Sequence, residues 1–324
     1  MRAVTCRRYG PPEVLRIEDI PSPPVGPRDL RVCVHATTVT SGDARLRGCR
    51  GPVIFWLPLR LFFGLRRLRQ PVLGMEFSGV VQATGAEVER FKPGDPVFGI
   101  VLQGAHAEYL AVACDGAVAH RPSGLSDAEA AALPFGAMSA LVFLRDVAKL
   151  RTGERLLVVG AAGGVGVFAV QLGRHFGAHV TALCGADAFP LVRALGADAV
   201  LERGHEGAMG SHDVILDTVG GLSFSQVRHR LTAGGRYVTL NFGLADLLGM
   251  FWSWLRPGPR LLCGFSGNNP DDLAIIAAMA EAGTLRPVIG RSLALEDAME
   301  AHRHVDSGRK RGSVVLHVTP CPVE

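Results

Sequence analysis

A glycine-rich stretch near the middle of the chain has the residue types and the spacing needed to hold a phosphate. An apolar run at 155–159 is followed by Gly-Ala-Ala-Gly-Gly-Val-Gly at 160–166 and then by apolar residues at helical spacing. In a dinucleotide fingerprint, Gly163 stands where the backbone approaches the pyrophosphate, Gly166 where strand and helix touch, and Ala161 replaces the first glycine. Backbone N–H groups at a helix N-terminus attract an anion. We therefore predict a dinucleotide-binding turn, with phosphate contacts from Gly163, Gly164, Val165 and Gly166.

The residues around this turn have the length and pattern of a strand–helix–strand unit. Residues 167–175 continue at helical spacing, Gly177 and Ala178 end the helix, and 179–183 reads as the next strand. A unit of about 30 residues is what a right-handed crossover needs. A doubly wound domain that binds no nucleotide is the alternative, because glycine-rich turns also occur there.

The wider pattern predicts an α/β chain with two domains. Over 1–120, short strands are separated by glycine and proline, which indicates an antiparallel, barrel-like domain. Beyond it the pattern becomes helical, with a capping box from Ser126 to Glu129. Over 121–262, strands and helices alternate, which predicts a parallel, doubly wound sheet. The segment 263–324 adds a helix and a last strand that returns to the first domain. The clearest strands are 30–36, 79–83, 96–101, 108–112, 155–159, 179–183, 199–201, 214–217, 236–240 and 313–318, and the last helix is 271–283.

Composition limits the class of protein. The 324 residues, 48% of them hydrophobic, are enough for a large core in two domains. The net charge of +4 and the lack of a basic block beside aromatic residues argue against nucleic-acid binding. The first residues carry no apolar signal core, so we expect a cytoplasmic protein. Its seven cysteines are scattered, which predicts small buried thiols instead of a disulfide framework or a thiolate zinc site.

Four motifs together cover nearly the whole chain: Gly-Pro-Pro-Glu-Val-Leu at 10–15, Gly-Met-Glu-Phe-Ser-Gly-Val-Val at 74–81, Phe-Lys-Pro-Gly-Asp-Pro-Val at 91–97, and the glycine turn. In this combination the chain resembles the medium-chain dehydrogenase/reductase superfamily, in its zinc-less quinone oxidoreductase branch. The resemblance implies a GroES-like β-barrel catalytic domain, a Rossmann domain and an active site in the cleft between them. It also implies a homodimer, which is common in the family.

The resemblance bears on zinc as well. Zinc alcohol dehydrogenases of the superfamily place a cysteine just ahead of a conserved aspartate, and a histidine in a Gly-His-Glu motif. Here Thr40, ahead of Asp43, and Met75 hold those positions, and the four-cysteine structural lobe is missing. A hydroxyl and a thioether do not make a usual zinc site, so we predict neither catalytic nor structural zinc.

The second strand of the doubly wound domain bears on the choice of cofactor. Enzymes that prefer NAD usually carry an acid about 20 residues past the glycine turn. Here that strand ends at Gly185 without a carboxylate, and Arg203 could pair with a 2′-phosphate. Lys310 matches a basic residue that lies near the cofactor in the family. We predict NADPH over NADH, although Asp187 could serve the ribose, and solvated surface charge is the alternative for Arg203 and Lys310.

Further cofactor contacts follow from the resemblance. Thr218 and Val219 follow the fourth strand of the sheet, and Asn241 and Phe242 follow the fifth, at the strand ends where dinucleotides bind. Ser139 matches a family threonine or serine near the nicotinamide, with an ordinary helix serine as the alternative.

Without zinc, the expected reaction is hydride transfer from the nicotinamide to an electron-poor quinone or α,β-unsaturated ketone. Orientation alone can lower such a barrier by roughly 7 to 11 kcal/mol, and a donor to the developing oxyanion adds to it. Thr40 and Ser41 are the candidate donors, where the family commonly has Asn-Pro-x-Asp. Asp43 matches the family aspartate, for which we favour a loop-orienting role. Tyr109 and Tyr237 are further possible donors, with core packing as the alternative.

Two apolar segments, 52–65 and 244–255, hold all three tryptophans and are too short to span a bilayer. They could line an entrance for a lipophilic substrate, contact a membrane peripherally, or bury each other or a dimer interface. The predicted function is therefore an NADPH-dependent quinone or enone reductase. An enoyl reductase of a biosynthetic pathway and a non-catalytic NADPH-binding interaction protein are the alternatives.

Overall fold

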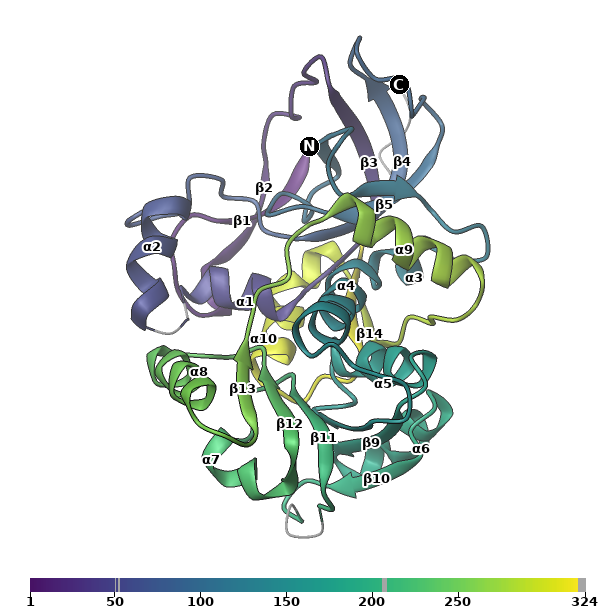
Figure 1. Ribbon diagram of the computed structural model, residues 1–324. Helices are drawn as coiled ribbons and strands as arrows, with labels where there is room; N and C mark the ends of the chain where they lie inside the picture. The colour runs from purple at the N-terminus through teal and green to yellow at the C-terminus, as the bar shows by residue number, and fades with distance from the viewer. Residues whose placement is uncertain (50, 52, 206–208, 320–324) are drawn as a thin grey trace. The chain divides into compact units, whose positions relative to one another are not determined.

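The structure is a computed structural model that describes residues 1–49, 51, 53–205 and 209–319, without the side chains of 53–56 (Figure 1). It contains two compact units. The first comprises Met1–Phe135, Asn268–Gly283 and Pro287–Glu324, and the second comprises Gly136–Gly267 and Thr284–Arg286. The predicted α/β class, with a GroES-like barrel domain and a doubly wound sheet, is confirmed.

The second unit is built on six parallel strands in the order β10-β9-β8-β11-β12-β13. The chain starts in the centre at β8, moves outward through β9 and β10, and then crosses to β11 on the other side of β8. This reversal creates a switch point between β8 and β11, where open α/β sheets bind ligands. The strands are β8 (Arg155–Val159), β9 (His179–Cys184), β10 (Ala199–Glu202), β11 (His212–Asp217), β12 (Leu231–Thr239) and β13 (Arg260–Cys263).

The helices of this unit flank the sheet. Figure 1 shows α5 and α6 beside β9 and β10, and α7 and α8 beside β12 and β13. All five strands predicted here are present, while β13 was not predicted. The helices are α4 (Pro134–Val142), which crosses from the first unit, α5 (Gly166–His175), α6 (Phe189–Ala194), α7 (Phe224–Val227) and α8 (Leu244–Leu255).

The first unit contains a seven-stranded sheet in the order β14-β15-β3-β4-β5-β7, with β6 paired to β3. All pairs are antiparallel except β14 with β15. Because β15 pairs with β3, the C-terminal segment lies in the barrel. The strands are β3 (Asp29–Thr38), β4 (Glu76–Thr84), β5 (Pro96–Ile100), β6 (Tyr109–Ala113), β7 (Val118–His120), β14 (Ile289–Ala294) and β15 (Ser313–His317), beside a hairpin of β1 (Arg2–Cys6) and β2 (Leu15–Asp19).

Helices complete the first unit: α1 (Ser41–Gly48), α2 (Val53–Phe63), α3 (Asp127–Ala131), α9 (Pro270–Glu281) and α10 (Ala298–Asp306). Arg47, at the far end of α1, is fully buried and pairs with Asp306 of α10 at 2.5 Å. A guanidinium without solvent is costly unless paired. This ion pair therefore fixes α1, the helix whose first turn carries Asp43, against α10.

The two units divide between Phe135 and Gly136, later than the predicted boundary near residue 120. The reason is α3, which follows the predicted capping box of Ser126 and Glu129 but packs on the barrel strands β3, β4 and β15. Its Asp127 accepts hydrogen bonds from Ser78 of β4 at 2.7 Å and from His35 of β3 at 3.0 Å. The bond with Asp127 raises the pKa of His35 to about 9.

Because α3 packs on the barrel strands, the helical pattern of the sequence begins before the first unit ends. At the other end, 263–267 and 284–286 of the predicted C-terminal segment belong to the second unit.

Candidate active site

The glycine turn of the second unit has two glycines with different tasks. A Cβ on Gly166, the first residue of α5, would lie 2.1 Å from the carbonyl oxygen of Gly160, so only glycine lets the helix meet β8 this closely. At Gly163 a Cβ would lie 3.2 Å from the same oxygen, and the Gly163 N–H donates to it at 2.9 Å. Gly166 therefore serves the fold, while the lack of a side chain at Gly163 leaves its backbone bare to a group that approaches it.

A buried carboxylate fixes the loop that follows β11. Asp217 is fully buried, and its two oxygens accept hydrogen bonds from four successive backbone N–H groups, 219–222, at 2.8 to 3.2 Å. Sequence reasoning treated Asp217 only as the end of a strand. An acid at the end of an otherwise apolar strand, followed by Thr-Val-Gly-Gly, is the signal that could have identified it.

Tyr237 of β12 supports the same loop. Its hydroxyl donates to the Leu222 carbonyl at 2.6 Å and lies 3.0 Å from Asp217 Oδ2. Burial and the Asp217 charge raise the pKa of Tyr237. Because its hydroxyl is engaged inside the unit, Tyr237 packs in the core. This is the alternative that we gave to hydrogen-bond donation to the substrate. Tyr109, the other tyrosine considered, is half-buried on β6.

The predicted cofactor residues after β8, β11 and β12 converge at one edge of the sheet. Thr218 Oγ1 donates to the Val159 carbonyl at 2.8 Å, and a Cβ on Gly160 would lie 2.6 Å from Val219, which is half exposed. On the other side, a Cβ on Gly220 would lie 3.1 Å from Asn241. The structure thus brings the glycine turn, Thr218, Val219 and Asn241 together at the switch point.

Phe242 and Ser139 each contact the segment 265–266. Phe242 is buried, and its ring packs edge-on against the exposed Phe265 with centroids 5.0 Å apart. Ser139 Oγ lies 3.0 Å from Ser266 Oγ. Its helix α4 contacts the glycine turn, because a Cβ on Gly136 would lie only 2.3 Å from the Gly164 carbonyl. Ser139 is therefore three residues, less than one helical turn, from a residue that touches the predicted phosphate site.

Gly185 and Arg203 lie side by side at the end of β9. The Arg203 N–H donates to the Cys184 carbonyl at 3.0 Å, which places the exposed Arg203 next to Gly185. A Cβ on Gly185 would lie 2.8 Å from the Asp187 carboxylate, so Asp187 occupies the same neighbourhood. Both the cation expected for a 2′-phosphate and the acid that could serve a ribose are present at this strand end.

In the first unit, Thr40 and Asp43 form a capping box at the start of α1. Asp43 Oδ2 accepts from the Thr40 N–H at 2.8 Å and from the Thr40 hydroxyl at 2.6 Å, and Oδ1 accepts from the Gly74 N–H at 3.0 Å. This is the loop-orienting arrangement favoured for Asp43. Because the single Thr40 proton points to Asp43, substrate donation by Thr40 stays a prediction that requires release of that bond. Ser41, the first residue of α1, is half-buried.

Glu76, at the start of β4, is a buried acid. The sequence indicated no role for it beyond its place in the motif at 74–81. Oε1 accepts from the Phe135 N–H at 2.6 Å, and Oε2 accepts from the Thr38 hydroxyl. Burial raises the pKa of Glu76 to about 7. Lys310 is half-buried as a residue, but its ammonium group is enclosed: burial lowers its pKa, and the charges of Glu76 and Asp43 oppose that change. The structure therefore places the Lys310 charge near two acids of the barrel.

The positions compared with zinc ligands lie in the first unit, and the cysteines lie in both units. Thr40 Oγ1 and Met75 Sδ lie 3.6 Å apart at the positions where zinc enzymes of the family have ligands. Across the described parts of the chain, no group of three or more His, Cys, Asp or Glu side chains could hold a metal ion. Cys6 and Cys184 are buried as expected, whereas Cys33, Cys49, Cys114 and Cys263 are only half-buried; Cys321 lies outside the described residues.

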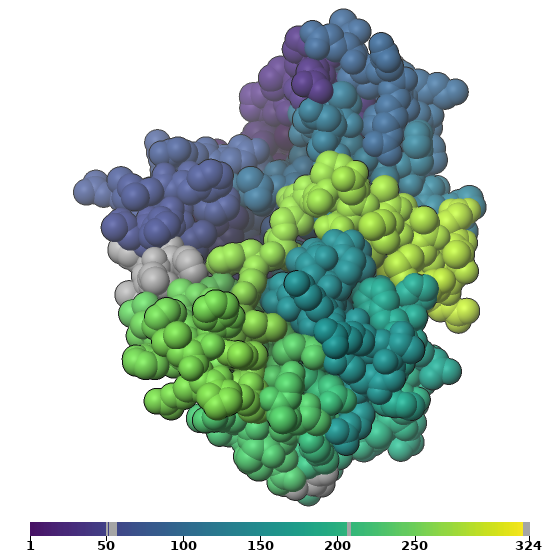
Figure 2. Space-filling view, viewed as in Figure 1, coloured from purple at the N-terminus to yellow at the C-terminus, as the bar shows by residue number. Residues whose placement is uncertain are grey.

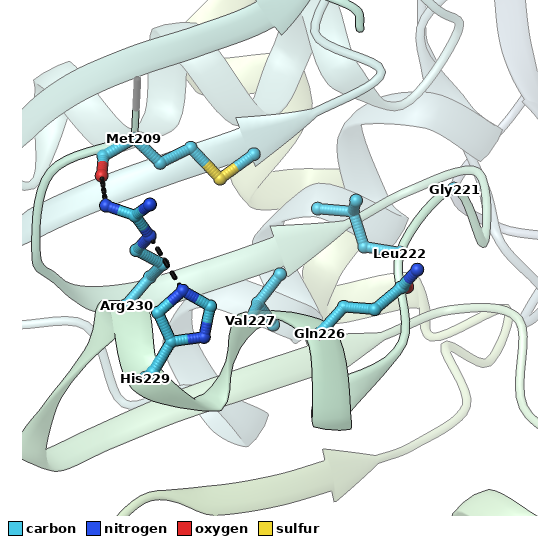
Figure 3. Close-up of a pocket in the computed structure, with 7 residues that line it drawn as sticks. All are labelled: Met209, Gly221, Leu222, Gln226, Val227, His229 and Arg230. Carbon is cyan, nitrogen blue, oxygen red and sulfur yellow. Dashed lines mark hydrogen bonds between the residues drawn. The ribbon is translucent and has the colours of Figure 1, made fainter. Parts of the chain in front are cut away.

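A pocket of about 340 Å³ opens elsewhere in the second unit, around α7 (Figure 3). Arg230 crosses one wall, donating to the Met209 carbonyl at 2.6 Å and to His229 at 2.9 Å. The pocket excludes the glycine turn and every predicted cofactor residue, so we place the functional site at the strand ends instead. Its lining residues are Met209, Gly221, Leu222, Gln226, Val227, His229 and Arg230.

Comparison with known proteins identifies the family. The model of the alcohol dehydrogenase GroES-like domain matches residues 26–144, and that of the zinc-binding dehydrogenase matches 195–316. The mitochondrial NAD(P)H oxidoreductase RTN4IP1 of Homo sapiens is 34% identical over 361 residues, covering 98% of this chain and 89% of that protein. The chain belongs to the medium-chain dehydrogenase/reductase superfamily, in its quinone oxidoreductase-like branch.

Two further similarities extend across most of this medium-chain dehydrogenase/reductase. The quinone oxidoreductase from Coxiella burnetii has the same fold, with a TM-score of 0.86, 27% identity, and coverage of 98% of this chain and 99% of that one. The pikromycin polyketide synthase component PikAII of Streptomyces venezuelae is 31% identical over 325 residues, which cover 92% of this chain and 8% of that protein. The chain is an NAD(P)H-dependent oxidoreductase.

The two glycines of the turn allow a matched pair of variants. Gly166→Ala should destabilise the second unit by about 1 to 3 kcal/mol or more, because the methyl overlaps a backbone carbonyl. Gly163→Ala should lower the melting temperature less than Gly166→Ala does but weaken NAD(P)H binding, because the methyl stands where we expect the pyrophosphate to approach the backbone. Thermal melts and fluorescence titration with NADPH measure both. Wild-type affinity in Gly163→Ala would contradict the placement of the phosphates.

Glu76 predicts a pH dependence of stability. Its pKa is raised from about 4.5 to about 7 on folding, so the native state binds the extra proton between these values, and stability falls as pH rises through that window. Relative to Glu76→Gln, the wild type should therefore lose on the order of 3 kcal/mol of unfolding free energy from pH 4.5 to above pH 7. Urea denaturation across this range measures it, with Glu89→Gln at an exposed site as the control. A constant difference between wild type and Glu76→Gln would show that Glu76 does not titrate there.

Proposed function

We propose that the protein transfers a hydride from NADPH to a quinone or an α,β-unsaturated carbonyl compound without zinc. The observation that carries the proposal is the edge of the sheet at β8, β11 and β12. There the bare backbone of Gly163, the N-terminus of α5 and the loop held by Asp217 lie together. Backbone N–H groups at a helix start and a glycine without a side chain are what a pyrophosphate requires.

The preference for NADPH is supported by the end of β9. Arg203 is exposed and stands beside Gly185, and guanidinium groups pair well with phosphate oxygens. The strand itself ends in Cys184, without an acid that would repel a 2′-phosphate. Lys310 adds less support than expected from the sequence, because its ammonium group already interacts with the acids Glu76 and Asp43.

Independence from zinc is supported by the donor set around Asp43. A hydroxyl at Thr40 and a thioether at Met75 are poor ligands for zinc, and Asp43 is engaged by three hydrogen bonds from Thr40 and Gly74. Without a Lewis acid, the acceptor itself has to be electron-poor. We therefore propose an acceptor whose carbonyl is conjugated, with orientation supplying much of the rate.

The chain's own residues then have separate tasks. When bound, NADPH supplies the hydride. The glycine turn and Arg203 would bind its phosphates. The loop held by Asp217 would orient the remainder of the cofactor through Thr218 and Val219. Of the two candidate donors to the developing oxyanion, we favour Ser41 over Thr40, because the Thr40 proton is directed to Asp43.

An enoyl reductase of a biosynthetic pathway is the second candidate. It is supported by the similarity to a polyketide synthase component over 92% of this chain. The two candidates share hydride transfer to a conjugated carbonyl and differ in the acceptor, since the second would require an acyl thioester.

The first test follows NADPH oxidation at 340 nm with a panel of quinones, enones and enoyl thioesters. We expect turnover with NADPH that EDTA does not abolish, and a lower rate in Ser41→Ala, which removes the proposed donor. Thioester reduction in the absence of quinone turnover would favour the enoyl reductase. Loss of activity in EDTA that added zinc restores would contradict zinc independence.

Arg203 provides the test of cofactor choice. Arg203→Ala should raise KM for NADPH about tenfold, as loss of one charge-assisted hydrogen bond would, and leave KM for NADH unchanged. Arg193→Ala, which removes an exposed arginine of α6 in the same unit, is the matched control. Equal effects on both cofactors would remove Arg203 from 2′-phosphate recognition.

A further inference from the structure

Helix α8 presents Ser253 and Gly249, together with Met250, to the protein. Ser253 is the buried residue of this helix; its hydroxyl donates to the Met250 carbonyl at 2.8 Å and accepts from the Leu261 N–H of β13 at 3.0 Å. Gly249 faces the same strand, because a Cβ there would lie 3.0 Å from the Leu261 side chain. A surface helix of a globular protein normally packs its apolar face inward. In α8 Met250 packs against the core, but most of the large apolar side chains face outward instead.

The outward face of α8 is almost entirely apolar. Six large side chains are each more than half exposed, and Trp254 reaches 73%. Figure 2 shows this helix, in light green, at the surface of the molecule. An exposed set of this size on a helix of 12 residues marks a binding surface, because scattered apolar residues do not cluster in this way. The six are Leu244, Leu248, Phe251, Trp252, Trp254 and Leu255.

The width of this apolar face distinguishes between a second helix and a membrane interface as its partner. At about 100° per residue, Leu244, Leu248, Phe251 and Leu255 fall within roughly 60° of the helix circumference. Trp252 and Trp254 lie roughly 70 to 90° to either side of that centre. A seam between two helices needs only a narrow stripe, whereas a helix lying in a membrane interface immerses its whole apolar half. Tryptophan at both margins is the arrangement favoured at lipid–water interfaces.

The charges beside this face are cationic. Arg256 directly follows the helix, is exposed, and holds its guanidinium 5.8 Å from the Trp252 ring centre. Arg228 is exposed beside the next turn, where a Cβ on Gly258 would lie 3.9 Å from it. The one acid within 244–256, all of which the structure describes, is Asp246, and it is half-buried and accepts from the Gly243 N–H at 2.9 Å. The face is therefore complementary to anionic headgroups.

We propose that α8 binds the surface of a lipid bilayer that contains anionic lipids, with its axis in the plane of the interface. A helix of 12 residues is about 18 Å long and cannot span a hydrocarbon core of about 30 Å. The helical stretch Asp127–Val147 has the length and hydropathy of a span, but 72% of its most apolar window is buried inside the protein. The contact is therefore peripheral. It stands on the geometry of α8 and is independent of the proposed acceptor.

The test is co-sedimentation of the full chain with phosphatidylcholine vesicles, with and without phosphatidylglycerol. We expect binding that is stronger with phosphatidylglycerol and at least tenfold weaker in the double variant Leu248→Gln, Phe251→Gln, which removes two immersed side chains. Arg256→Gln should reduce binding to the anionic vesicles only. Ile275→Gln, at an exposed isoleucine of α9, is the matched control and should bind like the wild type.

A second readout separates lipid from a second copy of the chain. Wild-type tryptophan emission should shift to the blue when anionic vesicles are added, and the shift should disappear in Trp252→Phe, Trp254→Phe. Sedimentation velocity without lipid should give the same oligomeric state for wild type and the Leu248, Phe251 double variant. Absence of vesicle binding by the wild type, or loss of an oligomer in the double variant, would overturn the proposal. NADPH oxidation in lipid-free solution should be unchanged in these variants. Vesicle binding is measured without any acceptor, so failure to find an acceptor would not affect this test.

Discussion

The carboxylate of Asp217 is the constraint on which the cofactor edge depends. Four consecutive N–H groups converge on a buried acid, so the loop 218–222 has one arrangement that satisfies both the charge and the backbone donors. Any other arrangement would leave buried polar groups unpaired, at a cost of several kcal/mol. Thr218 transmits this constraint to β8 through Val159. The loop and the glycine turn are thereby fixed relative to each other before any ligand binds.

The first unit uses the same device. Asp43 accepts from Thr40 and Gly74, which joins the start of α1 to the segment that carries Met75. In the zinc enzymes that the chain resembles, the corresponding positions hold metal ligands. Here the hydrogen bonds of a capping box hold these segments together. Glu76 is a third buried acid, and burial raises its pKa to about 7. Each unit thus has its own preorganised element, built from hydrogen bonds to a buried carboxylate.

Much of the fold could be predicted because its strongest signals are local. Continuous apolar runs such as β8 and the glycine turn that follows depend on neighbours within a few residues, and so does the capping box of Ser126 and Glu129. The strand β14 (Ile289–Ala294) escaped because it alternates between half-buried and exposed residues and contains a glycine. The roles of Asp217 and Glu76 escaped for another reason: their partners come from tertiary folding, as when Glu76 accepts from Phe135 far along the chain. Thr40 and Asp43 do have the spacing of a capping box, a local signal that our prediction did not use.

The most direct test of the central claim is the fate of deuterium from NADPH that carries deuterium at both C4 positions of the nicotinamide. With an α,β-unsaturated ketone as acceptor and EDTA present, mass spectrometry of the saturated product should find one deuterium on the β-carbon. That result would establish hydride transfer to an electron-poor carbon without a metal. A reduced product without deuterium, or no reduction of any conjugated acceptor by a chain that binds NADPH, would contradict the account.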